Sequence, residues 1–166
     1  MTLTKTILAA TVALALPLAA LAQDSASSGE NPFRLLKGNQ YGIVSIPGMV
    51  DTLPETSKNV IEDQTVLHRP GGGVRVFRLY GAVPQHYHMR SDAILYILKG
   101  RGMFKIEDED PVEAGPGDML FWAAGTQHGN PEVIEGPIDV LVFDLPTRDP
   151  SDTIWANPRE APSFLE

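Results

Sequence analysis

Short apolar runs separated by glycine, proline, asparagine and aspartate recur along the chain from Phe33 onward. The runs cover residues 41–46, 64–67, 74–80, 93–98, 102–107, 119–122 and 138–145. This spacing of short strands and turns is typical of a β-sandwich or β-barrel. Helical periodicity is lacking outside the first residues, and 15 glycines and 14 prolines disfavour long helices. The pattern predicts one all-β domain, for which 166 residues suffice.

The first residues of the chain have the pattern of a targeting segment. Lys5 precedes an apolar run over residues 7–21, which ends in the small-x-small signature Ala20-Leu21-Ala22. The alternative is a membrane anchor, but the run is interrupted by Pro17 and lies at the short limit for a span. We therefore predict that residues 1–22 are a cleaved signal peptide and that the chain is exported to the periplasm or the medium. No later run is apolar enough to cross a bilayer, so no membrane association is expected after cleavage.

The segments on either side of the apolar runs differ in composition. Residues 23–40 begin rich in serine, glycine and aspartate, which predicts a flexible leader. Residues 41–146 are expected to form the barrel. Residues 147–166 contain repeated prolines, which exclude a long helix or an interior strand. Trp155 and Phe164 indicate that this tail still packs, either on its own barrel or on a partner subunit.

Composition excludes several classes of function. The chain has no cysteine, so disulfide scaffolds and thiol enzymes are excluded and any metal must bind to nitrogen or oxygen. A formal net charge of −8 opposes binding to nucleic acid. The sequence also lacks a phosphate-binding loop and a serine nucleophile elbow, so phosphoryl and serine-dependent acyl transfer are not expected.

Three histidines are candidate metal ligands. His86 and His88 flank one residue, and because side chains alternate across a strand they project to the same face. His128 follows a glycine-containing turn that leads into another strand, and barrel closure could bring it beside the pair. An isolated pair of this kind is more often a polar strand face. The metal interpretation therefore depends on the residues around the histidines.

Those surrounding residues resemble the two motifs of the cupin superfamily. The first motif is matched by Gly81, His86, His88 and Gly100, and the second by Gly117, Asp118, Gly125 and His128. A hairpin at residues 100–102 is expected between them, and the resemblance covers roughly residues 64–145. It implies a double-stranded β-helix, which is a small jelly-roll barrel, with a metal ion in its mouth and often a homodimer.

Two positions depart from the family pattern. Ala123 replaces a usual proline, and Ala93 stands where a glutamate often completes the metal ligands. Three neutral imidazoles without a carboxylate leave a divalent ion its full charge and an open position, which favours an anionic or chelating ligand. Asp92 is a further candidate ligand, although alternation directs it to the opposite face. The metal is expected to be zinc, iron or manganese, in no order.

Several side chains are candidates for binding a small-molecule ligand. Arg75 and Arg78 have opposite parity on one strand, so one of them should face inward, where it would complement a carboxylate or phosphate. Weaker candidates are Gln85, Tyr96 and Asn130. Ala93, Leu95 and Ile97 should form an apolar wall, Trp122 and Trp155 should belong to the core or an interface, and His68 should lie in a loop.

Three functions are compatible with the resemblance. The first is a metal-dependent isomerase or lyase acting on a small oxygen-rich anion, or a dioxygenase if the metal is iron. The second is a non-catalytic protein that binds a metal or small ligand, for which the loss of the glutamate at Ala93 is the distinguishing feature. The third is a metal-free structural barrel.

Overall fold

The computed structural model describes residues 31–37 and 40–161. The predicted signal peptide (1–22), the first part of the leader (23–30) and the end of the tail (162–166) lie outside the described residues. Within the described part, no helix has the length and apolar character needed to span a bilayer.

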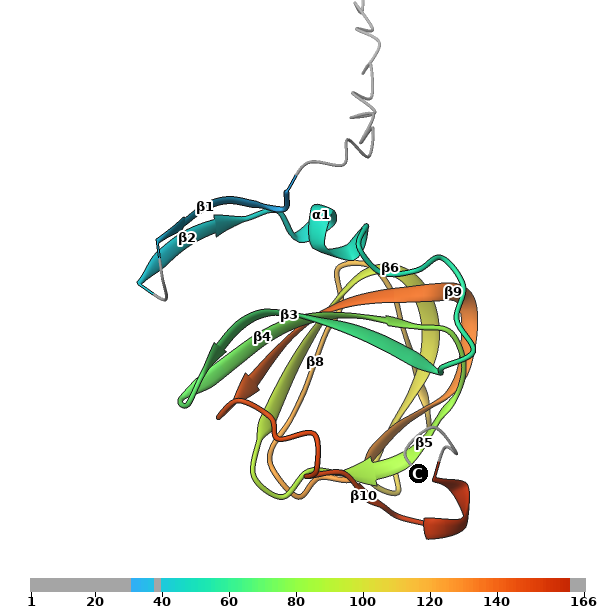
Figure 1. The fold of residues 1–166 in the computed structure, drawn as a ribbon. Coiled ribbons are helices and arrows are strands. Elements are labelled where there is room, and N and C mark those ends of the chain that lie inside the picture. Colours follow the sequence, from blue (N-terminus) through green and yellow to red (C-terminus); the bar gives the residue numbers. More distant parts are fainter. Residues whose placement is uncertain (1–30, 38–39, 162–166) are drawn as a thin grey trace, which may run out of the picture.

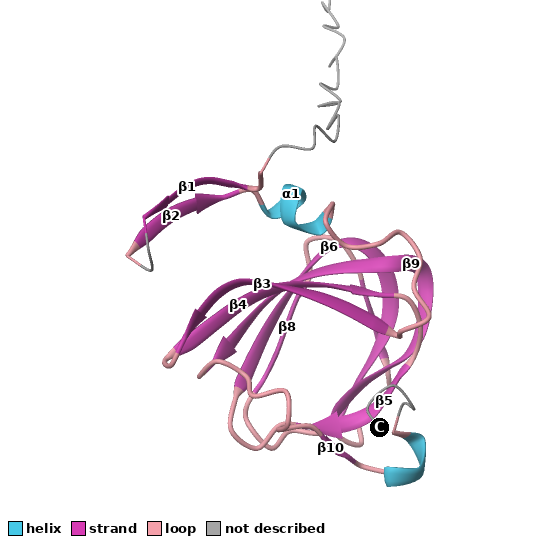
Figure 2. Cartoon of the chain, viewed as in Figure 1, coloured by secondary structure: helices cyan, strands magenta, loops and turns pink. Residues whose placement is uncertain are grey.

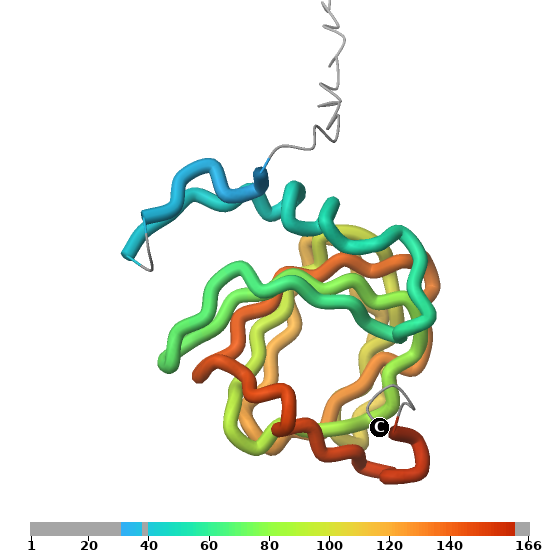
Figure 3. The backbone as a smooth tube through the Cα atoms, viewed as in Figure 1, coloured from blue at the N-terminus to red at the C-terminus, as the bar shows by residue number. Residues whose placement is uncertain are grey.

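An eight-stranded antiparallel sheet forms the body of the molecule and curls into a barrel (Figures 1 and 3). Its strands are β3 (Ile61–Arg69), β4 (Gly72–Leu79), β5 (Val83–Tyr87), β6 (Asp92–Ile106), β7 (Val112–Ala114), β8 (Met119–Trp122), β9 (His128–Leu145) and β10 (Ile154–Trp155). The helices among the described residues are α1 (Ile46–Val50) and the single-turn η1 (Pro158–Glu160), as Figure 2 shows. The predicted all-β barrel is confirmed.

Strand β9 joins the parts of the sheet. It pairs with β4 from Ile138 to Asp144, with β6 along nearly its whole length, and with β5 near its start. In the last of these pairings His86 lies opposite His128. The strand therefore fixes the position of the third histidine relative to the first two.

Strand β6 differs from the prediction of two strands joined by a hairpin. It runs without reversal through residues 100–102, with irregular register against β9. Gly100 has φ +80°, and a Cβ there would lie 2.6 Å from the carbonyl oxygen of Pro137. The glycine thus allows β6 to bend while staying close to β9, so the predicted hairpin is wrong.

The interior of the barrel is lined by alternating apolar residues. Ala93, Leu95 and Ile97 are each at most 5% exposed, which confirms the predicted apolar wall. They belong to a buried cluster that also contains Phe77, Leu79, Val83, Phe104, Ala114, Ile138, Val140 and Val142. Burial of this set removes most of the inward-facing apolar surface from water and is the main stabilising contribution to the barrel.

A second buried cluster lies on the outside of β4, between the barrel and the N-terminal segment. It contains Met49 and Val50 of α1, Leu53 and Val76, with Phe33 and Val44 packed against it. These last two residues belong to β1 (Phe33–Lys37) and β2 (Tyr41–Val44), which form a separate two-stranded sheet. Residues 33–37, which we assigned to the leader, and residues 41–44, which we assigned to the barrel, thus pair with each other outside the barrel sheet.

Arg78 connects the barrel to the segment that follows α1. Its guanidinium forms a bidentate pair with Asp139 on β9, with Nε–Oδ1 at 2.6 Å and Nη2–Oδ2 at 3.0 Å. Nη1 also donates to the carbonyl oxygens of Leu53 and Pro54. The hydrogen bond to Asp139 raises the pKa of Arg78. Arg78 faces this outer layer with its donors already engaged, so it is not the inward-facing arginine of β4.

We predict that Arg78→Ala lowers the free energy of unfolding by about 3–5 kcal/mol, because it leaves the Asp139 carboxylate buried and unpaired. Arg101→Ala is the matched control, since its pair with Glu113 is about half exposed (46% and 50%) and should cost less than about 1 kcal/mol. Urea unfolding monitored by circular dichroism measures both. An equal loss of unfolding free energy in the two variants would contradict a stabilising role for the buried Arg78–Asp139 pair.

Candidate functional site

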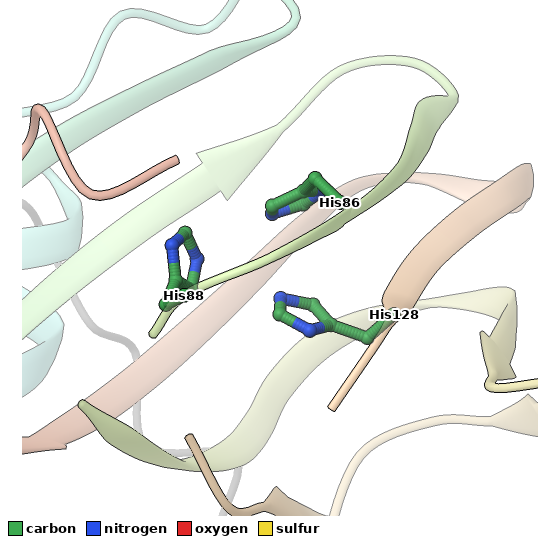
Figure 4. Close-up of side chains that lie close together, drawn as sticks. All are labelled: His86, His88 and His128. Atoms are coloured by element: carbon green, nitrogen blue, oxygen red, sulfur yellow. The ribbon is translucent and has the colours of Figure 1, made fainter. Parts of the chain in front are cut away.

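Three histidine side chains from two paired strands point toward one another (Figure 4). His86 lies on β5, His88 directly follows it, and His128 is the first residue of β9. The ring centroids are 4.4 to 5.2 Å apart, and one ligand nitrogen from each ring lies within 4.8 Å of the other two. The predicted meeting of the three histidines across the barrel is thus observed, and they could hold a metal ion.

All three imidazoles make the same kind of hydrogen bond through Nδ1. The partners are the backbone carbonyl oxygens of Pro84 for His86 (2.9 Å), Asp152 for His88 (2.6 Å) and Thr126 for His128 (2.9 Å). A carbonyl oxygen can only accept, so each Nδ1 must carry the proton and each Nε2 keeps its lone pair. This is the arrangement that orients a histidine toward a metal. The donor chemistry therefore fits a divalent ion.

Burial keeps these imidazoles neutral. It is the largest cause that lowers the pKa of all three, to about 4 for His88 and about 2 for His128. For His128 the neighbouring His86 lowers the pKa further, and for His88 the charge of Arg148 does so. At neutral pH protons therefore compete weakly with a metal for the Nε2 lone pairs.

Two tryptophans flank the histidines. Trp122 stacks on His128 with centroids 4.0 Å apart and planes 26° apart, and Trp155 lies 5.0 Å from His86. Both also pack against the main apolar cluster, which confirms the expected core role. Sequence analysis did not anticipate that they restrict the imidazole rings at the same time.

Asp92 is not part of this cluster. Its Oδ1 accepts a hydrogen bond from the backbone N–H of Ala124 at 2.8 Å, while the neighbouring Ala93 faces the interior. Among the described residues, the group that includes these histidines contains no carboxylate within ligand distance. The structure therefore places Asp92 outside the three-histidine group, on the side that strand alternation gives it.

A hollow of about 430 Å³ opens beside His86. Its charged lining consists of Arg75, Arg148, Asp63 and Asp144, and its other residues include His68 and Trp155. Arg75 faces this hollow and pairs with Asp144, with Nε–Oδ2 at 2.9 Å. Of the two arginines on β4, Arg75 is thus the inward one. His68, expected in a loop, is instead the last residue but one of β3, and it also lines the hollow.

The three weaker ligand candidates lie elsewhere. Gln85 donates to the carbonyl oxygen of Glu107 and borders a different depression, and Tyr96 is 41% exposed on the outer face of β6. Asn130 is buried, and its Nδ2 donates to the carbonyl oxygens of Met103 (2.6 Å) and Glu132 (3.2 Å). None of these three lines the hollow beside His86, so the structure does not bring them together with the histidines there.

The tail returns across the site as a segment that we call the C-terminal strap, residues 147–157. Its strand β10 pairs with β5, which places Trp155 opposite His86 and Ile154 opposite Tyr87. The carboxylate of Asp152 accepts hydrogen bonds from the N–H groups of Met89 and Arg90. For its described part, the tail therefore packs on its own barrel, one of the two alternatives that the sequence left open.

The strap supplies the functional residues that sequence analysis missed. Arg148 lines the hollow, and the carbonyl oxygen of Asp152 orients His88. No local motif marks these positions, because their role arises only when the strap docks on β5. The signals in the sequence were Trp155 and Phe164, large apolar residues in a proline-rich tail, and they indicated packing without indicating a role at the site.

Comparisons with known proteins agree with this geometry. The family model described as "Cupin domain" matches residues 78–143. KdgF from a Halomonas species is 27% identical, with a TM-score of 0.52 over 60% of this chain and 93% of that chain. A conserved protein with a double-stranded β-helix domain from Klebsiella pneumoniae is 17% identical, with a TM-score of 0.55 over 65% of this chain and 94% of that chain.

A third similar structure is the DMSP lyase DddQ from Ruegeria pomeroyi. It is 21% identical, with a TM-score of 0.52 over 59% of this chain and 52% of that chain. A search among curated proteins found no match. The likenesses below a quarter identity establish the fold, a double-stranded β-helix, and leave the chemistry to the site itself.

We predict that the metal-free protein loses stability as the pH falls from about 7 to about 5.5. The pKa of His88 is lowered in the folded state to about 4, so below its ordinary value of 6.5 the unfolded chain binds protons that the folded chain does not. Each such histidine contributes a slope of up to about 1.4 kcal/mol per pH unit. Urea unfolding of chelator-treated protein measures this slope. The slope of unfolding free energy against pH should decrease in His88→Gln. An unchanged slope in this variant would contradict the lowered pKa of His88.

Proposed function

Because this chain belongs to the cupin superfamily, we propose that it binds one divalent metal ion through His86, His88 and His128 and acts there on a small oxygen-rich anion. The observation that carries the proposal is the set of three Nδ1–carbonyl hydrogen bonds, which leaves three Nε2 lone pairs free in a buried cluster. A purely structural histidine cluster would have no need for the same tautomer at all three positions.

The identity of the metal is part of this proposal. Three imidazole nitrogens suit zinc, iron or manganese, and we keep these three as candidates. When bound, such an ion would supply Lewis-acid chemistry to an oxygen of the ligand, or oxygen activation if it were iron. With no carboxylate in the group, the ion would keep its double charge and attract an anion.

The residues of the hollow support an anionic ligand. Arg75 is mostly buried, with 15% of its side chain exposed, and it is held in place by Asp144. Trp155 covers His86 from the strap side and limits the access of water to the imidazoles. An arginine fixed beside the histidines would orient a carboxylate by hydrogen bonds while another oxygen reached the ion.

Isomerase or lyase chemistry is the reaction class that we favour, with dioxygenase chemistry as the iron-dependent variant. A non-catalytic role in capturing a metal or small ligand is the second candidate, and one observation favours it. Of the two carboxylates in the hollow, Asp144 is paired with Arg75, and Asp63 has 56% of its side chain exposed. Neither carboxylate is both buried and unpaired, which is the setting expected of a general base.

Export and self-association complete the proposal. Residues 1–22 have the pattern of a signal peptide, which supports a periplasmic or extracellular location. The hairpin formed by β1 and β2 exposes several large apolar side chains, namely Leu35 (46%), Leu36 (62%), Tyr41 (53%) and Ile43 (48%). Apolar surface of this kind is typical of a protein contact, which supports a homodimer.

We predict that the double variant His86→Ala/His88→Ala loses the bound metal, because it removes two of the three ligand nitrogens. The protein should be purified without a histidine tag, and its metal content measured by elemental analysis. His68→Ala is the matched control, since His68 lines the hollow outside the three-histidine group and the variant should keep its metal. A metal-free wild-type protein after anaerobic reconstitution, or equal metal content in the double variant, would contradict the proposal.

A further inference from the structure

Arg148 lines the hollow and has no carboxylate partner among the residues that the structure describes. Its Nη2 donates to Oγ1 of Thr153 at 3.1 Å, while its Nε is buried without a hydrogen-bond partner among the described residues. No ion pair within 4.0 Å joins it to a described carboxylate. Burial is the main cause that lowers the pKa of Arg148, to about 10, so the guanidinium remains charged at neutral pH.

The other mostly buried arginines are paired. Arg78 has the carboxylate of Asp139, and Arg75 has that of Asp144. Burying a guanidinium without a carboxylate partner is unfavourable, and proteins rarely retain such a group without a use for it. Arg148 therefore differs from Arg75 and Arg78: it lines the hollow, and its buried Nε has no hydrogen-bond partner among the described residues.

The charges around the hollow point to the kind of ligand that could use this donor. The formal charges of the two arginines and two aspartates in its lining cancel. Each of the three histidines would be neutral as a ligand, because its Nδ1 donates to a carbonyl oxygen and its Nε2 would bind the ion through a lone pair. A bound divalent ion would therefore leave a local charge of about +2, which a ligand with two negative charges would neutralise.

We propose that Arg148 anchors one anionic group of a small dianionic ligand, whose second anionic group reaches the metal position at the three histidines. The proposal rests on the proposed function and adds the ligand class. A carboxylate in the hollow would accept hydrogen bonds from the guanidinium of Arg148, in the planar geometry that arginine favours. The hollow of about 430 Å³ limits such a ligand to a small molecule.

The position of Arg148 on the C-terminal strap ties this anchor to the histidines. The same strap contributes the carbonyl oxygen of Asp152 to His88 and the ring of Trp155 to His86. One docked segment thus holds both the proposed anchor and two of the three imidazoles in place. The distance between the two ends of the ligand is therefore fixed by the fold.

The test compares dicarboxylates with monocarboxylates of the same carbon number. Zinc-loaded protein is titrated calorimetrically with malonate, succinate and glutarate, and with propionate, butyrate and valerate. At least one dicarboxylate should bind the wild type more tightly than its monocarboxylate partner. Arg148→Gln should raise the dissociation constant of that dicarboxylate by about tenfold to a hundredfold. The dissociation constant of the monocarboxylate should stay within about twofold of the wild-type value. Arg148→Lys should give an intermediate loss, because it keeps the charge without the planar donor geometry.

The controls separate this inference from the proposed function. Arg101→Gln removes an exposed arginine that pairs with Glu113 away from the hollow, and it should bind as the wild type does. Zinc content and unfolding midpoint should be the same in all variants. Suppose that zinc binds, but Arg148→Gln weakens the binding of dicarboxylates and monocarboxylates equally or weakens neither. The anchor is then refuted while the metal site stands, and the same holds if no dicarboxylate binds the zinc-loaded wild type. If the wild type binds no zinc, the proposed function itself fails.

Discussion

The pairing of β5 with the start of β9 is the contact on which the site depends. It places His86 opposite His128, which are far apart in sequence, and strand alternation then directs His88 to the same interior. The remaining length of β9 is held by β4 and β6, so the position of His128 is supported by much of the barrel sheet. A shift of one residue in this register would turn the imidazole of His128 to the outer face.

Burial and hydrogen bonding together determine what these histidines can do. The interior lowers their pKa values, which would be costly for any imidazole that had to carry a charge. Backbone carbonyl oxygens from three different segments satisfy the three Nδ1 groups, and one of these segments is the C-terminal strap. The strap is itself held by Asp152, whose carboxylate accepts two backbone N–H groups near the end of β5. The orientation of His88 therefore depends on the docking of the tail.

Much of the barrel was predictable because its strands alternate regularly. The predicted run at 119–122 coincides with β8, and the run at 74–80 nearly coincides with β4. The continuity of β6 through Gly100 was not predictable, because a glycine with positive φ can serve a bulge as well as a hairpin. The β1–β2 hairpin was missed since its contacts are with α1 and the outer cluster, which no local pattern indicates.

For the site too, local patterns predicted some features, whereas others depend on long-range contacts. Spacing within one strand was enough to pair His86 with His88 and to predict that Arg75 or Arg78 faces inward. Which arginine does so depends on the register between β3, β4 and β9, a long-range property. Arg148 and Asp152 were not identifiable, because their roles depend on where the tail docks.

The most direct test of the central claim is anomalous diffraction from crystals of the metal-loaded protein, recorded at the absorption edge of the bound metal. The account predicts one strong peak, about 2.0–2.2 Å from Nε2 of His86, His88 and His128. No protein carboxylate should lie among the ligands. A peak that contacts Nδ1 of these rings, or one located away from them, would contradict it.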